Sequence, residues 1–336
     1  MGEHRRRVWD ISRTEFVGES EVGPGSVRAS LWHQGRLNAV DGLVEVAPGV
    51  WQARGYDISN IRFLAGGRGW VIIDPLTSEA CARACLDLAN AELGERPVTA
   101  VRCTHSHIDH FGGVRGVVDE AAVEAGEVQI IAPDQFMREA VFENVIAGPA
   151  MGRRASYQFG MTLPAGPLQH VDCGLGKATP TGMVGLIPPT ISIMETGQEL
   201  LVDGIRIIFQ LTPEAEAPAE MNFFLPDHRA VFMAENANLC MHNLLPARGA
   251  LVRDAKAWAD YLTESIRLFA GESDVMFAEH GIPRFGTEEI VAFLANHRDA
   301  YKFLHDQTIR LMNTGLVATE IAEVLKLPDV LAKQWY

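Results

Sequence analysis

The segment Thr104-His105-Ser106-His107-Ile108-Asp109-His110 places three histidines and one aspartate within six residues. It follows the apolar run 98–103, which predicts a buried strand. Imidazole and carboxylate groups are zinc-type ligands, and the alternating positions 105 and 107 point to one side of an extended turn. Asp109 and His110 stand where the chain turns into the next helix, so they point differently. The segment predicts a metal-dependent hydrolase with ligands for two ions; the alternative is a polar loop with satisfied histidines.

The remaining ligands must come from distant parts of the chain, because four side chains cannot fill two metal sites. In layered α/β folds, functional groups gather at the C-terminal ends of strands. The acidic and imidazole side chains that follow strand-like runs in this sequence are Glu214, Glu216, Glu220, Glu235 and His280. A single glutamate of this kind is usually a solvated loop residue, but their joint placement favours a shared site.

Strand-like and helix-like stretches alternate in two batches, which an irregular Gly- and Pro-rich stretch over 148–190 separates. Two mixed sheets packed back to back, with helices outside, form the simplest α/β architecture for this order. The helix predicted over 78–93 has a Ser or Thr cap. Residues 1–40 are predicted to form a surface arm, and 300–336 a helical end.

The irregular stretch is predicted to line the pocket, since long loops in compact domains are usually functional. Its apolar side chains could form a channel for an alkyl chain, although such residues are more often part of a core. The residues proposed for this channel are Met151, Tyr157, Phe159, Met161, Leu186 and Ile187.

Charge and composition restrict the class of protein. With 29 basic and 43 acidic residues the net charge is −14, which argues against a general nucleic-acid binder. The five cysteines form no disulfide framework, and we expect Cys81 and Cys85 to be packing residues. No apolar signal-peptide region or membrane-spanning run is present, so we expect a cytoplasmic protein, or a secreted or periplasmic one if the N-terminus is processed.

The Thr-His-x-His-x-Asp-His motif resembles that of the metallo-β-lactamase superfamily, and the wider sequence resembles its linear alkylsulfatase branch. The motif alone would indicate only the fold; the Glu-Ala-Pro-Ala-Glu stretch at 216–220 and Ala-Glu-Asn at 234–236 indicate the branch. The other stretches that carry the resemblance are 42–60, 70–76, 104–114, 185–190, 242–243 and 248–250. The resemblance implies an αββα sandwich with a helical C-terminal segment, and hydrolysis of linear alkyl sulfates to alcohol and inorganic sulfate.

The resemblance also implies a ligand set for two zinc ions. One ion would be held by His105, His107 and Glu216, and the other by Asp109, His110 and His280. Glu235 would bridge the two ions, and Asp74 would orient a ligand histidine. Asn243 and Arg248 would hold the sulfate, since the guanidinium fork can donate two hydrogen bonds to sulfate oxygens. The alternative for Arg248 is a surface salt bridge. The 177–184 loop matches no proton donor of the family.

The family's organisation implies an N-terminal arm over 1–42, a catalytic domain over 43–304, and the start of a helical dimerisation region over 305–336. We therefore expect a homodimer. The family's C-terminal sterol-carrier-like domain is absent from this chain, which indicates a truncated or processed form.

Three other functions stay open. The same metal site could serve a thioesterase, a lactonase or a β-lactamase. A diiron redox protein on this fold typically has a carboxylate at the second motif position, where this chain has His107. The chain could also be a module that only binds metal and catalyses no reaction, although the complete ligand set argues against this. The sequence decides neither the physiological ester nor whether the S–O or the C–O bond breaks.

Overall fold

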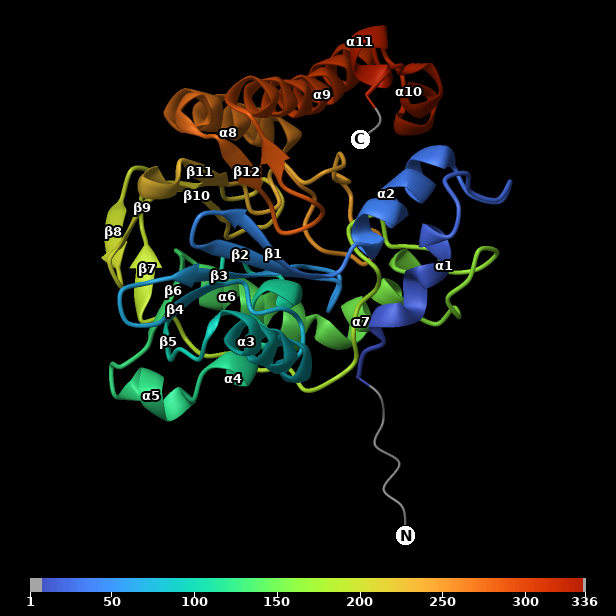
Figure 1. Ribbon diagram of the computed structural model, residues 1–336. Coiled ribbons are helices and arrows are strands. Elements are labelled where there is room, and N and C mark those ends of the chain that lie inside the picture. The colour runs from blue at the N-terminus through green and yellow to red at the C-terminus, as the bar shows by residue number, and fades with distance from the viewer. Residues whose placement is uncertain (1–7, 335–336) are drawn as a thin grey trace.

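The computed structural model describes residues 8–334, in which two β-sheets stack face to face between two layers of helices (Figure 1). The first seven residues of the predicted N-terminal arm and the last two residues of the helical region lie outside the described residues. The αββα sandwich predicted from the sequence is confirmed, and a helical segment follows it.

The first sheet carries the strand that leads into the histidine motif. Its strands are β1 (Gly42–Ala47), β2 (Val50–Arg54), β3 (Ile61–Ala65), β4 (Trp70–Ile73), β5 (Val98–Arg102), β6 (Gln129–Pro133) and β7 (Ile191–Ile193), adjacent in that order. Strands β1 to β4 pair antiparallel, whereas β4 to β7 pair parallel. The parallel half places the ends of β4 and β5 at one edge, where Asp74 and the motif begin.

The second sheet carries the other candidate ligands. Its strands, in spatial order, are β13 (Arg284–Phe285), β12 (Val275–Phe277), β11 (Ala230–Phe232), β10 (Met221–Leu225), β9 (Ile205–Leu211) and β8 (Glu199–Val202). Only β11 and β12 among these pair parallel. An antiparallel bridge between His105 and Glu220 joins the two sheets at the edge that holds the motif.

Helices cover both outer faces. Against the first sheet lie α3 (Glu79–Leu93), α4 (Val114–Val117), α5 (Glu120–Glu124) and α6 (Phe136–Val141); against the second lie α8 (Ala255–Leu268) and α9 (Thr287–Asn313). The Ser78 hydroxyl accepts a hydrogen bond from the Cys81 N–H, which confirms the predicted cap of α3. Helix α9 continues past position 304, the predicted domain boundary, and ends at Asn313. Two short helices follow it, α10 (Ala318–Val324) and α11 (Asp329–Ala332).

The predicted surface arm and the stretch predicted to be irregular both contain helices. The arm forms η1 (Ile11–Thr14), α1 (Glu15–Gly18) and α2 (Ala29–Ala39), and Trp32 of α2 is buried with Val17 and Val171. The 148–190 stretch begins with α7 (Gly148–Gln158), which the π-helical turn η3 (Phe142–Ile146) precedes. Pro149 lies in the first turn of α7, where a proline breaks no intrahelical hydrogen bond.

The core has three apolar layers. Phe63, Trp70 and Ile72 pack against Cys81 and Cys85 of α3, which confirms that these cysteines are packing residues. A second layer fills the space between the sheets, and a third lies between the second sheet and helices α8 and α9. No described helix combines the length and the apolar character that crossing a membrane requires.

The layer between the sheets also contains a buried ion pair. Arg62 Nη1 lies 2.5 Å from Glu279 Oε2, both side chains are fully buried, and the guanidinium stacks on Phe232. Burial raises the pKa of Glu279 to about 7, although Arg62 acts in the opposite direction. Removal of either partner would leave the other as a buried charge without compensation, which destabilises the fold.

Glu279→Ala should lower the free energy of unfolding by about 3–5 kcal/mol, because it leaves a buried arginine without its partner. Urea unfolding in the presence of a chelator would measure this loss without a contribution from bound metal. Glu199→Ala is the matched control, since Glu199 pairs with Arg206 at the surface. A loss no larger for Glu279→Ala than for the control would contradict the prediction.

Candidate metal centre

The seven predicted ligands converge from four loops, each of which follows a strand. The histidine motif follows β5, Glu216 follows β9, Glu235 follows β11 and His280 follows β12. Ala234 has a left-handed backbone conformation with φ = 42°, which is strained for a residue with a side chain. This turn directs the chain out of β11 just before Glu235.

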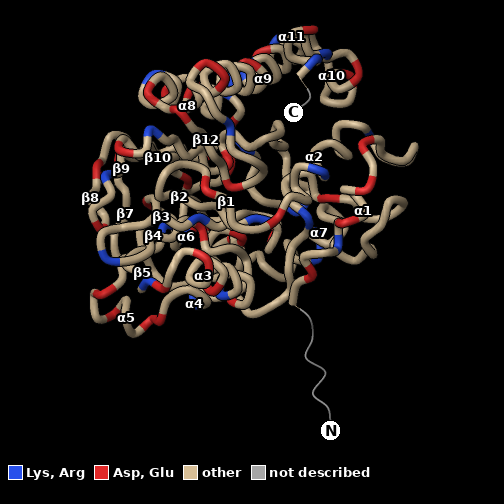
Figure 2. The backbone as a smooth tube through the Cα atoms, in the orientation of Figure 1, with Lys and Arg blue, Asp and Glu red and all other residues tan. Residues whose placement is uncertain are grey.

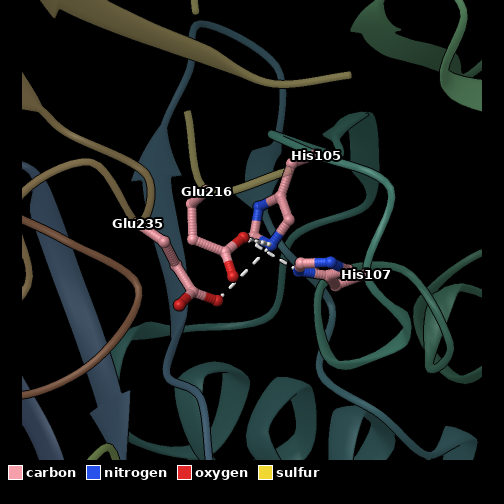
Figure 3. A group of neighbouring side chains, drawn as sticks. All are labelled: His105, His107, Glu216 and Glu235. Atoms are coloured by element: carbon pink, nitrogen blue, oxygen red, sulfur yellow. Dashed lines mark ion pairs between the residues drawn. The ribbon is translucent and has the colours of Figure 1, made fainter. Parts of the chain in front are cut away.

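One ligand group consists of His105, His107, Glu216 and Glu235, and its ligand atoms all lie within 4.8 Å of one another. Figure 3 shows the four side chains pointing toward a common centre. His107 Nδ1 lies 2.9 Å from Glu216 Oε2, and His105 Nε2 lies 3.5 Å from the same oxygen. His105 Nε2 is also 3.4 Å from Glu235 Oε1.

The second ligand group consists of Asp109, His110, Glu235 and His280. Glu235 Oε1 lies 3.0 Å from the Nε2 atoms of both His110 and His280. Asp109 Oδ2 lies 3.0 Å from His110 Nε2 and 3.7 Å from His280 Nε2. Because Glu235 belongs to both groups, its carboxylate stands between two neighbouring places for a cation.

Hydrogen bonds away from the centre orient the histidine rings. His280 Nδ1 lies 2.9 Å from the Ile58 carbonyl oxygen, so this nitrogen carries the proton and Nε2 faces the centre. His110 Nδ1 lies 3.2 Å from Asp74 Oδ2. Asp74 is itself held by hydrogen bonds from the Thr104 N–H and hydroxyl, so it lies where a partner that orients His110 is needed.

The donor atoms fit a metal ion. Within residues 8–334, the buried His105 Nε2 has no hydrogen-bond partner, which is costly unless a cation completes it. Burial lowers the pKa of His105 to about 4, and His110 acts in the same direction, so the imidazole is neutral and able to ligate at neutral pH. Burial alone would raise the pKa of Glu216, but the Arg253 guanidinium lowers it to about 2. In the second ligand group, burial acts to lower the pKa of both histidines, but the two carboxylates of that group raise it, and a bound divalent cation would take the place of the histidine protons.

Two residues beside the centre were not predicted. His242 Nε2 lies 3.0 Å from Glu235 Oε2 and 3.6 Å from Glu216 Oε1. Arg253 donates to the Glu216 carboxylate and also, over 2.7 Å, to the Glu216 carbonyl oxygen. It therefore holds one ligand carboxylate at Oε1, the oxygen that does not face His105 and His107.

The predicted sulfate-binding residues lie at the rim of the same centre. Arg253 Nη1 donates to Asn243 Oδ1 over 2.7 Å, so Asn243 is fixed next to the metal ligands. Arg248 pairs with Glu143 of η3, whose other carboxylate oxygen lies 3.5 Å from His107 Nε2. Arg248 is therefore partly buried beside the centre and makes its salt bridge there, on the pocket side.

A cavity of about 640 Å³ opens onto the ligands, and His107, Asp109, Asn243, Arg248 and Arg253 are among its lining residues. Of the apolar residues proposed for the channel, Met151, Phe159 and Met161 line it. The prediction was wrong for the other three. Tyr157 is 91% exposed on α7, whereas Leu186 and Ile187 pack into the core beside the first sheet.

Basic side chains lie in this cavity beside acidic ones. Acidic and basic residues are interspersed over the fold (Figure 2), and the net charge is −14. Arg248 and Arg253 nevertheless both line the cavity. The cavity is also lined by the carboxylates of Asp109, Glu143, Glu216 and Glu235. An anionic group would therefore be attracted there only with cations bound to the ligand groups.

The family model described as the metallo-beta-lactamase superfamily matches residues 54–280, which include every ligand in both groups. The chain belongs to the metallo-β-lactamase superfamily. The match extends from the end of β2 to His280, so the arm and α9 to α11 lie outside it. Membership and the His/Asp/Glu cluster together indicate a metal-binding protein.

Within the superfamily, this chain is similar to sulfatases. It is 45% identical over 334 residues to a linear primary-alkylsulfatase of Pseudomonas sp., with 99% of this chain and 50% of that protein covered. It is 45% identical to an (R)-specific secondary-alkylsulfatase of Pseudomonas sp., with 98% and 50% covered. The chain thus spans about half the length of these curated relatives.

Solved structures agree with these relationships. The structure of a stereoselective inverting sec-alkylsulfatase from Pseudomonas sp. matches with a TM-score of 0.95 at 44% identity, covering 98% of this chain and 52% of that one. A metallo-β-lactamase from Hirschia baltica matches with a TM-score of 0.51 at 17% identity, covering 76% and 97% of the two chains, and supports the shared fold.

Proposed function

We propose that this member of the metallo-β-lactamase superfamily hydrolyses linear alkyl sulfate esters to an alcohol and inorganic sulfate, with two zinc ions as cofactors. The observation that carries the proposal is the placement of Arg248 and Asn243. Both residues line the cavity onto which the ligand groups face, and part of the remaining wall is apolar. A substrate with an anionic head and an apolar chain matches such a cavity. The similarity to alkylsulfatases supports the same substrate class.

Different residues of the chain would bind the metal ions, the sulfate group and the alkyl chain. The seven predicted ligands would hold the metal ions, with Glu235 shared between them. When bound, divalent zinc supplies Lewis-acid activation of water and of the sulfate ester. Arg248 and Asn243 would bind and orient the sulfate, and Met151, Phe159 and Met161 would exclude water around the alkyl chain. Asp74 would keep His110 in its ligating orientation.

A comparison of substrates tests the proposal. The purified protein would be assayed for sulfate release from dodecyl sulfate and shorter linear alkyl sulfates, and in parallel with a chromogenic β-lactam, a lactone and an acyl thioester. We expect sulfate release to exceed turnover of the other substrates and to rise with alkyl length. Preferred turnover of a thioester, a lactone or a β-lactam would overturn the sulfatase assignment while retaining the metal centre.

Metal analysis of the same preparation separates the remaining alternatives. We expect about two zinc ions per chain, since two candidate groups share the Glu235 carboxylate. The third candidate group, Asp74 with His105 and His110, reuses their histidines. Iron with a redox-active spectrum would instead support the diiron alternative, and bound metal without turnover of any ester would support a binding module. A secondary alkyl sulfate belongs in the assay, because one similar protein is a secondary-alkylsulfatase.

The domain division and the homodimer stay proposals. Helix α9 crosses position 304, so the boundary proposed there falls within a helix. Exposed apolar side chains on α9 to α11, including Met312, Val324 and Val330, would suit a contact with a second copy. Light scattering of the purified protein would test this, and a monomer mass at micromolar concentration would contradict it.

A further inference from the structure

Glu220 is a buried carboxylate beside the metal centre that belongs to neither ligand group. Its side chain is almost completely buried. Its carboxylate oxygens accept three hydrogen bonds within the described residues, each from a backbone N–H group. Oε2 accepts from the Glu216 N–H over 3.0 Å and from the Ala217 N–H over 3.3 Å. Oε1 accepts from the Glu235 N–H over 3.2 Å. One carboxylate thus holds the main chain of both ligand glutamates.

The backbone of Glu220 connects this pair to the histidine motif. Glu220 forms the isolated antiparallel bridge with His105, and the next residue, Met221, donates its N–H to the Thr104 carbonyl oxygen over 2.9 Å. Three chain segments that supply ligands therefore meet at one residue. Glu216 comes from one ligand group, and Glu235 belongs to both.

Electrostatics make this an unfavourable place for a carboxylate in a protein without bound cations. The side chain is buried next to the Glu216 and Glu235 carboxylates, which repel a third negative charge. A neutral side chain would fill the same space without this repulsion. What a neutral side chain lacks is a second acceptor oxygen, so it could not hold both ligand segments at once.

We propose that Glu220 is a positioning residue for the metal centre: its two oxygens fix the backbone at Glu216 and Glu235 so that both carboxylates meet the metal ions in register. The inference rests on the proposed metal centre. It predicts that the two acceptor oxygens and the length of residue 220 govern how tightly metal is held, without direct contact between Glu220 and the ions.

Glu220→Gln is the first test, because glutamine keeps the shape but has one acceptor oxygen and one donor nitrogen. Loss of a residue that orients metal ligands typically lowers metal affinity by about 10- to 100-fold. We expect metal transfer to a chromogenic chelator to be faster by a comparable factor. Activity should fall, and added zinc should restore it in part, whereas wild-type activity should not respond. Glu214→Gln is the matched control, since Glu214 is exposed on the same loop.

A cobalt-substituted protein gives a readout that a purely structural role would not change. The visible absorption of Co²⁺ responds to ligand geometry, so the spectrum of Glu220→Gln should differ from that of the wild type and of Glu214→Gln. If Glu220→Gln does not fold, Glu220→Asp provides the comparison. It keeps the charge but is too short to span both segments, so its metal should be released faster than from the wild type.

The outcomes separate this inference from the proposed function. Wild-type metal release and an unchanged cobalt spectrum in both variants would overturn the inference alone. Lower stability of the chelated protein with normal metal affinity would also overturn it, because Glu220 would then serve only the fold. A wild-type protein that binds no metal would overturn the metal centre and this inference together. A protein that binds metal but releases no sulfate would contradict only the sulfatase assignment.

Discussion

Glu235→Gln is expected to reduce sulfate release from alkyl sulfates by on the order of 10³-fold, the largest loss among the ligand variants. The reason is that Glu235 belongs to both ligand groups. Its Oε1 atom faces His105, His110 and His280, so a change at this position affects both places for a metal ion. An amide in its place offers one neutral oxygen and weakens the electrostatic attraction for two cations at once.

Metal content and activity should be measured together. We expect Glu235→Gln to retain fewer zinc ions per chain than the wild type after dialysis, and to stay poorly active at saturating zinc. Glu214→Gln again serves as the control, because it removes a carboxylate from a nearby loop outside both groups. Full zinc content with nearly normal turnover would show that Glu235 is not shared between two ions.

Much of the centre could be predicted because its signals are local. The motif from Thr104 to His110 is contiguous, and Glu235 and His280 each follow a short apolar strand. A strand that ends in a polar residue at the edge of a layered sheet is recognisable without knowledge of its neighbours. The choice of Glu216 over Glu214 and Glu220 came from the family resemblance, since all three follow the same strand.

The residues that sequence reasoning missed act through contacts between distant segments. Arg253 holds Glu216 from 37 positions away, and Glu143 reaches Arg248 from 105 positions away. His242 stood in the stretch used for the resemblance, but nothing in the neighbouring residues indicated that it would face Glu235. Such pairings depend on how the loops fold over one another, and a local sequence pattern contains no information about that.

Apolar residues of the insertion show the same limit. Ile187 and Met151 are both apolar and both lie in the 148–190 stretch, yet one packs against the first sheet and the other lines the cavity. Composition indicates that a residue leaves water, but not which apolar surface it meets. The channel prediction was therefore right for Met151, Phe159 and Met161 as lining residues, and wrong for the others.

Arg248→Ala is expected to lower kcat/KM for alkyl sulfates by about 10²- to 10³-fold, because removing one partner of a buried charged hydrogen bond costs about 2–5 kcal/mol. The Arg248 side chain is 15% exposed and lies at the wall of the cavity. Arg248→Lys should recover part of the loss, since lysine keeps the charge but not the planar fork that suits a sulfate group.

Glu143 supplies the comparison that identifies what Arg248 binds. Without substrate, the Glu143 carboxylate occupies the guanidinium, so an incoming sulfate must displace a group of the same charge. Glu143→Gln should therefore lower KM several-fold while Arg248→Ala raises it, measured in one series of initial rates. Equal KM values for Arg248→Ala and the wild type would mean that Arg248 serves only its salt bridge with Glu143. The opposite signs expected for the two variants follow only if Arg248 exchanges a carboxylate of the chain for the sulfate of the substrate.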